Sequence, residues 1–147
     1  MKFDPVSPYG TILAGVDGSD AARRAAAHAL YLSRALGSKL LVLYVVDTHS
    51  TQALGVHYHE AVQELRASGQ TAIDEVLDQA RELSVNAEAI IADGSPGQQI
   101  CQVARERQVD LVVMGAKGKS ALEEMLLGSV SNFVLHHAQR PLLVVHS

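Results

Sequence analysis

Runs of apolar residues alternate along the chain with segments in which apolar residues recur every three or four positions. A continuous apolar run is typical of a strand covered on both faces, and the longer spacing is typical of a helix with one buried face. The predicted strands are 11–16, 39–46, 87–92, 110–114 and 142–145. The predicted helices are 21–36, 60–83, 96–108 and 129–138, and Gly69 interrupts the longest of them.

Strict alternation of strands and helices predicts an α/β fold in a single domain over residues 1–147. Crossovers between parallel strands are right-handed, so we expect helices on both faces of the sheet and a ligand crevice where the strand order reverses. Two segments fall outside the alternation. Residues 1–9 are expected to form a flexible tail, and residues 48–58, which show no period, a mobile loop.

Composition and charge narrow the classes of partner. The formal net charge is −4 and no run of lysine or arginine is present, so nucleic acid is not an expected partner. No apolar run approaches the ~18 residues of a membrane span, and the N-terminal residues lack an export signal, so we expect neither membrane insertion nor export. Cys101 is the single cysteine, so no internal disulfide can form, and a cytoplasmic protein is expected.

Glycines follow the predicted fourth strand and precede the last helix. Gly115 and Gly118 lie directly after the strand, and Gly128 stands at the start of the helix, followed by Ser129 and Ser131. Glycine lets the backbone approach a ligand closely, and free amides at a helix N-terminus attract anions. The pattern therefore indicates an anion site that flanks the crevice, to which the two serines add hydroxyl donors.

Two better-known phosphate-binding motifs do not fit this chain. The fragment Gly118-Lys119-Ser120 resembles the end of a P-loop, but that motif needs a glycine at the position of Val113. The turn at 15–18 lacks the third glycine of the dinucleotide fingerprint. A nicotinamide cofactor is therefore not expected.

The spacing Gly115-x2-Gly118-x9-Gly128-Ser129 resembles the nucleotide-binding signature of the ATP-binding universal stress proteins, at the same place in the chain. Residues 12–19 and 43–47, at the ends of the first two strands, also resemble that family. The likeness covers nearly the whole chain. It implies a Rossmann-like sheet with strand order 3-2-1-4-5, of the kind found in adenine nucleotide alpha hydrolases.

The resemblance also implies an ATP site, with Mg²⁺ accompanying the nucleotide. It places at the adenosine end Gly15, Val16, Asp17 and, against the adenine, Val45. It places around the phosphates Gly115, Gly118, Gly128, Ser129 and Ser131, with Met114 and Val130 completing the wall. Lys117 and Lys119 occupy variable positions of the loop, where a cation would offset triphosphate charge.

Several of these residues have a simpler interpretation. Asp17 could serve only to cap the first helix, and Ser129 and Ser131 only to cap the last one. The seven histidines do not indicate a zinc site, because neither the pair His57 and His59 nor the adjacent His136 and His137 is completed by a cysteine or an acid. No metal site within the protein is expected.

The resemblance favours a nucleotide-binding regulator of the stress response that acts on an unidentified protein partner. No catalytic residue is assigned, because phosphoryl transfer needs a metal-holding acid and a group that orients the nucleophile, and Asp17 is implied near the nucleoside instead. A slow ATP hydrolase or nucleotidyl-transfer enzyme is the alternative, and a dimerisation module without nucleotide is the third hypothesis. A homodimer through strand 142–145 is expected, because this apolar strand would otherwise be an open sheet edge, and in the family this edge joins two subunits.

Overall fold

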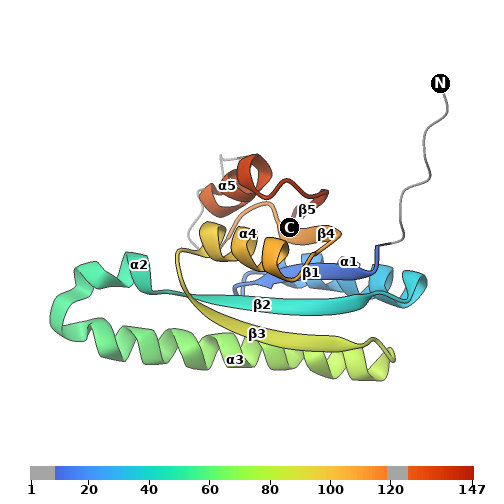
Figure 1. Ribbon diagram of the computed structural model, residues 1–147. Coiled ribbons are helices and arrows are strands. Elements are labelled where there is room, and N and C mark those ends of the chain that lie inside the picture. The colour runs from blue at the N-terminus through green and yellow to red at the C-terminus, as the bar shows by residue number, and fades with distance from the viewer. Residues whose placement is uncertain (1–8, 119–125) are drawn as a thin grey trace.

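Five parallel strands form one sheet, as the sequence predicts (Figure 1). The computed structural model describes residues 9–118 and 126–147. The strands lie in the order β3-β2-β1-β4-β5, which is the predicted order. Their bounds are β1 Thr11–Val16, β2 Lys39–Asp47, β3 Ala87–Gly94, β4 Leu111–Gly115 and β5 Leu142–Val145. The order reverses between β1 and β4, so a crevice opens where the carboxyl ends of these two strands part.

Helices cover both faces of the sheet. Their bounds are α1 Asp20–Leu36, α2 Thr48–Thr51, η1 Gln52–His57, α3 Tyr58–Glu82, α4 Pro96–Glu106 and α5 Ser129–His137. Helices α1 and α3 bury their apolar residues on one face, and α4 and α5 do so on the other. Figure 1 shows α3 on the opposite side of the sheet from α4 and α5.

Strand β2 shows why the central strands are continuously apolar. Leu40, Val42 and Tyr44 belong to the core beneath α1 and α3, whereas Leu41 and Leu43 belong to the core beneath α4 and α5. Side chains of a strand alternate between the two faces, so a strand that is buried on both sides needs apolar residues at every position. The reading of this run as a parallel central strand is confirmed.

Helix α1 begins and ends with sequence signals. The hydroxyl of Ser19 accepts a hydrogen bond from the backbone N–H of Ala22 at 3.1 Å, so Ser19 is the N-cap. The helix ends at Gly37, whose φ of 69° lies in the left-handed region and whose N–H donates to the carbonyl of Ser33. Gly37 closes the helix as predicted.

The segment predicted as a loop at 48–58 is helical. Helix α2 and the 3₁₀ helix η1 fill residues 48–57, and α3 starts at Tyr58. Asp47 caps the first of these turns, because its Oδ1 accepts a hydrogen bond from the N–H of Ser50 at 2.9 Å. Gly55 breaks the run with φ 59° and ψ −116°. Helical turns this short cannot display a hydrophobic period, which explains why the sequence pattern did not predict them.

The remaining boundaries differ from the prediction by one or two residues. Strand β3 continues to Gly94, and α4 stops at Glu106 rather than at 108, because Gln108 takes a φ of 51° as the chain turns toward β4. Within the two described ranges, no helix combines the length and the apolar character needed to cross a membrane.

Candidate functional site

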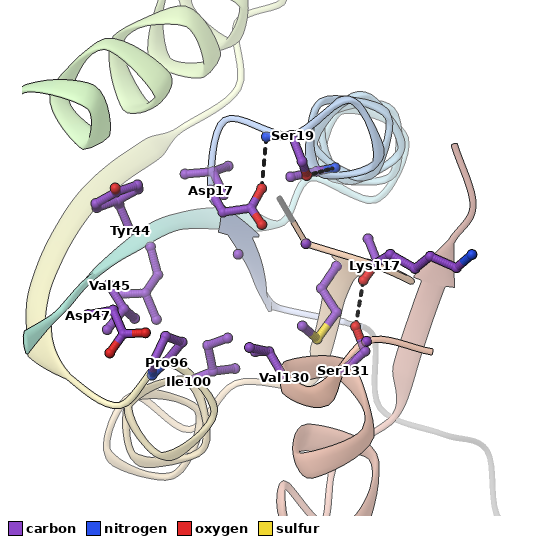
Figure 2. A pocket seen from close by; sticks show the side chains of 18 of the residues that line it. Asp17, Ser19, Tyr44, Val45, Asp47, Pro96, Ile100, Lys117, Val130 and Ser131 are labelled. Carbon is purple, nitrogen blue, oxygen red and sulfur yellow. Dashed lines mark hydrogen bonds between the residues drawn. The ribbon is translucent and has the colours of Figure 1, made fainter. Parts of the chain in front are cut away.

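A pocket opens at the carboxyl ends of β1, β2 and β4 (Figure 2). Its volume is about 490 Å³, and α4 and α5 contribute part of its wall. It is lined by 12 of the 13 residues that the sequence assigns to a nucleotide site: Gly15, Val16, Asp17, Val45, Met114, Gly115, Lys117, Gly118, Gly128, Ser129, Val130 and Ser131. The thirteenth, Lys119, lies outside the described residues.

Asp17 lies between the end of β1 and the glycine loop. Its Oδ1 accepts a hydrogen bond from the N–H of Ser19 at 2.9 Å. Its Oδ2 faces Gly118, where a β-carbon would approach this oxygen to 2.8 Å. Asp17 shapes the turn before α1, while Ser19 provides the N-cap, so the alternative role of Asp17 as the helix cap is not the arrangement that forms.

Close packing against α1 requires a glycine at position 115. A β-carbon at this position would lie 2.8 Å from Cβ of Ala21, 2.9 Å from its carbonyl carbon and 3.0 Å from the backbone nitrogen of Ala22. These are atoms of α1, and two of them belong to its backbone, so β4 and α1 can come this close only if residue 115 has no side chain. The close approach accounts for this glycine without a ligand.

Gly118 and Gly128 have a different environment. Among the residues that the structure describes, the close neighbour of a β-carbon at Gly118 would be the Asp17 carboxylate. A β-carbon at Gly128 would lie 3.3 Å from Cα of Lys117, and the N–H of Gly128 donates to the carbonyl of Ala116 at 2.7 Å. These two glycines bring the end of β4 and the start of α5 together as one continuous backbone rim of the pocket.

Ser131 uses its hydroxyl within the protein. The side chain is buried, and its Oγ donates to the carbonyl of Gly115 at 2.7 Å. The sequence hypothesis aims this hydroxyl at a phosphate, whereas in the structure its proton ties α5 to the end of β4. The N-cap of α5 is Gly128 and receives no side-chain hydrogen bond, so neither Ser131 nor Ser129 caps this helix.

Lys117 lines the pocket, but its ammonium group does not face it. Figure 2 shows the side chain extending away from the centre of the pocket. The contribution of Lys117 to the inner wall therefore comes from its backbone and the base of its side chain.

Apolar side chains form the other end of the pocket. Leu43 and Val45 come from β2, Pro96 and Ile100 from α4, and Val130 from α5. Figure 2 shows Val45, Pro96, Ile100 and Val130 around this part of the pocket. A flat apolar group, such as an aromatic ring, fits between walls of this kind.

Tyr44 closes the pocket on the side of α3. A β-carbon at Gly69 would lie 2.3 Å from Cδ1 of the Tyr44 ring, so the ring packs directly on the backbone of α3 at this glycine. Burial raises the pKa of Tyr44, and the negative charge of Asp17 raises it further. The phenol therefore stays protonated at neutral pH.

Sequence reasoning missed ten of the lining residues: Ser19, Ala22, Leu43, Tyr44, Asp47, Ser50, Leu65, Ser68, Pro96 and Ile100. Those on α3 and α4 depend on tertiary packing and carry no local signal. Ser19 and Asp47 do carry a local signal, because polar residues that follow parallel strands converge at the carboxyl edge of the sheet.

The pocket holds few acids. Asp17 and Asp47 are the carboxylates among its lining residues. Over residues 9–118 and 126–147, no group of three or more His, Cys, Asp or Glu side chains is arranged to hold a metal ion.

Comparison with known proteins identifies the family. The family model described as "Universal stress protein family" matches residues 8–146. The chain belongs to the universal stress protein family. Universal stress protein MJ0531 of Methanocaldococcus jannaschii is 35% identical over 139 residues, which cover 93% of this chain and 82% of that protein.

Solved structures of similar proteins share the fold. Protein MJ0577 of M. jannaschii has a TM-score of 0.85 at 26% identity, over 96% of this chain and 98% of its own. A universal stress protein solved in complex with cAMP has a TM-score of 0.64 at 26% identity, over 95% of this chain and 98% of its own. The Rossmann-like fold and the family predicted from the sequence are both confirmed.

Proposed function

We propose that this universal stress protein binds ATP in the pocket at the carboxyl ends of β1, β2 and β4, and that the bound nucleotide regulates its association with another protein during stress. The observation that carries the proposal is the two-ended character of the pocket. The backbone rim of Gly118 and Gly128 forms one end, and the apolar walls around Val45 and Ile100 form the other. An adenine nucleotide has the same division, with charged phosphates at one end and a flat base at the other.

The glycine end suits phosphate. Helix α5 begins at Ser129, directly on the rim, so its free N–H groups and the positive end of its dipole lie beside the pocket. Gly118 and Gly128 carry no side chains that would hold a phosphate away from these amides. Mg²⁺ is proposed to enter with the nucleotide, since this ion keeps several waters and is commonly held by the phosphates of the substrate.

The apolar end suits a purine. Burial of a flat ring between Val45, Ile100 and Val130 removes apolar surface from water on both of its faces. The universal stress protein solved with cAMP supports this choice, because its ligand carries adenine and the protein is 26% identical to this chain.

Regulation fits the site better than rapid catalysis. Phosphoryl transfer needs a metal-holding acid together with a group that orients the nucleophile, and the acids that line the pocket are Asp17 and Asp47, at opposite ends of it. The proposal therefore assigns no catalytic residue. The cytoplasm is the compartment we propose, since the single cysteine calls for no oxidising environment.

A homodimer through β5 is part of the proposal. Strand β5 is at the edge of the sheet and pairs with β4 on its inner side. Leu142, Leu143 and Val144 remain partly exposed there, which is the condition that strand pairing with a second copy would relieve. Light scattering in solution should give the mass of two chains, and a monomeric mass would contradict this part.

The proposal is tested by titrating ATP with Mg²⁺ in a calorimeter against the wild type, Gly118→Val and Gly10→Val. Valine at 118 places side-chain atoms against Asp17 and in the path of the ligand, so we expect ATP to bind at least about tenfold more weakly. Gly10 lies outside the pocket, and a β-carbon there would be 3.5 Å from the nearest atom, so Gly10→Val should bind ATP like the wild type. The proposal would be refuted if the wild-type protein did not bind ATP, or if Gly118→Val bound ATP with unchanged affinity.

A further inference from the structure

We infer that Asp47 makes the pocket selective for purines with an amino group at position 6 over purines with an oxygen there. The inference rests on the proposed nucleotide site and names the class of nucleotide that the site accepts. Asp47 is the last residue of β2, lines the pocket and is not among the residues that the family signature indicates.

The alternation of β2 directs Asp47 toward the apolar end of the pocket. Val45 and Asp47 are two positions apart, so their side chains leave the strand on the same face, whereas Tyr44 and Val46 belong to the core on the other face. Asp47 pairs in register with Gly94, close to the start of α4 at Pro96. Figure 2 shows Asp47 beside Val45, on the side of the pocket away from Lys117.

Hydrogen bonds hold this carboxylate in place and leave one oxygen available. Oδ1 accepts from the N–H of Ser50 at 2.9 Å, and the carbonyl of Asp47 accepts from the hydroxyl of Thr51 at 2.9 Å. In the described part of the chain, Oδ2 of Asp47 has no hydrogen-bond partner. The site thus presents a fixed acceptor to whatever occupies its apolar end.

The amides at the start of α5 favour one orientation of a nucleotide in the pocket. A phosphate would meet a like charge at either end, from Asp47 or from Asp17, but only at the end of Asp17 do the amides at the start of α5 offset the repulsion. The base therefore takes the end with Asp47. Two independent features, the apolar walls at one end and the helix amides at the other, favour the same orientation.

An ionised carboxylate can accept a hydrogen bond but cannot donate one. The amino group of a 6-aminopurine donates to it, whereas the oxygen of a 6-oxopurine would face it with lone pairs. A base that lies against Val45, Pro96 and Ile100 would itself shield this contact from water on one side, so a mismatched pair would be costly. Sites that provide a matching hydrogen-bond partner discriminate strongly against the analogue that cannot use it.

The test compares ATP with inosine triphosphate, which has the same sugar and phosphates but carries oxygen at position 6. Wild-type protein should bind ATP at least about tenfold more tightly than inosine triphosphate. In Asp47→Asn the amide can donate to that oxygen, so the two affinities should come within about threefold. Asparagine is also a good helix N-cap, so α2 keeps its cap.

Two further variants make the result specific. Asp93→Asn removes the same charge from β3, where Asp93 pairs with Arg66 at 2.7 Å and does not line the pocket, so it should keep the wild-type preference. Asp47→Ser keeps a capping hydroxyl but is too short to reach the base, so it should also lose the preference.

The outcomes separate the inference from the proposed function. Equal wild-type affinities for the two nucleotides, or a preference that survives both Asp47→Asn and Asp47→Ser, would overturn the role of Asp47 while leaving nucleotide binding intact. Wild-type protein that binds neither nucleotide would overturn the proposed function and, with it, the inference.

Discussion

Replacing Gly69 by alanine should reverse the usual effect of this substitution in a helix. In a helix interior, alanine is more favourable than glycine by about 0.8–1.0 kcal/mol. Gly69 lies within α3, which runs from Tyr58 to Glu82, so propensity alone predicts a more stable protein. The Tyr44 ring packs on this glycine, so we expect the substitution to lower the stability instead.

The size of the stability change follows from the contacts that a β-carbon at Gly69 would make with Tyr44. A β-carbon at Gly69 would lie 2.3, 2.4 and 2.7 Å from Cδ1, Cε1 and Cγ of Tyr44. Ordinary carbon contacts are about 3.5 Å, so the ring or the helix would have to move by roughly 1 Å. Tyr44 is 5% exposed and belongs to the second strand of the sheet, so its ring can move only toward the pocket that it lines, and overpacking of this kind costs about 1–3 kcal/mol. We expect a net loss of about 1–2 kcal/mol.

The assay is urea unfolding, followed by circular dichroism, of nucleotide-free wild type, Gly69→Ala, Tyr44→Ala and the double variant. Removing nucleotide matters because a bound ligand raises apparent stability. In the Tyr44→Ala background the ring is absent, so Gly69→Ala should stabilise the protein by up to about 1 kcal/mol, and the coupling between the two sites should reach about 2 kcal/mol. A Gly69→Ala variant that is stabilised in both backgrounds would refute the reasoning.

Three further predictions concern residues at or near the pocket. Gly115→Ala should cost about 1–3 kcal/mol of stability in urea unfolding, because the new β-carbon would lie 2.8 Å from Ala21; an unchanged midpoint would contradict the packing argument. Ser131→Ala should also destabilise the protein by about 1–3 kcal/mol, because the carbonyl of Gly115 loses its buried donor. The ATP affinity, measured by calorimetry, should change by less than about threefold. A larger loss of affinity would instead favour direct contact of Ser131 with phosphate. Burial raises the pKa of Cys101, so iodoacetamide should label it at least about tenfold more slowly in the folded than in the unfolded protein, as followed by mass spectrometry; equal rates would contradict its burial.

The fold could be predicted because its signals are local and repeated. A central strand such as β2 is apolar at every position since both of its faces are covered, and Ser19 and Gly37 mark the two ends of α1. The segment 48–57 could not be predicted in this way. Its short helical turns depend on local hydrogen bonds, such as the one that the N–H of Ser50 donates to Oδ1 of Asp47, and on tertiary packing.

The candidate site was predictable in its outline and less so in its chemistry. The glycine spacing brings Gly118 and Gly128 to one rim, but the same spacing does not distinguish them from Gly115, which contacts α1. The partner of the Ser131 hydroxyl depends on how α5 approaches β4, and no sequence pattern specifies that distance. Asp47 was visible only as the residue that ends a strand.

Binding of an adenine nucleotide is the central claim, and native mass spectrometry of the protein as purified tests it most directly. Acid extraction and chromatography would then identify any nucleotide released from the chain. An adenine nucleotide should be present in wild type and lost from Gly118→Val while that variant stays folded. Protein that is purified empty, and that still binds nothing when ATP and Mg²⁺ are added, would contradict the account and favour a dimerisation module without nucleotide.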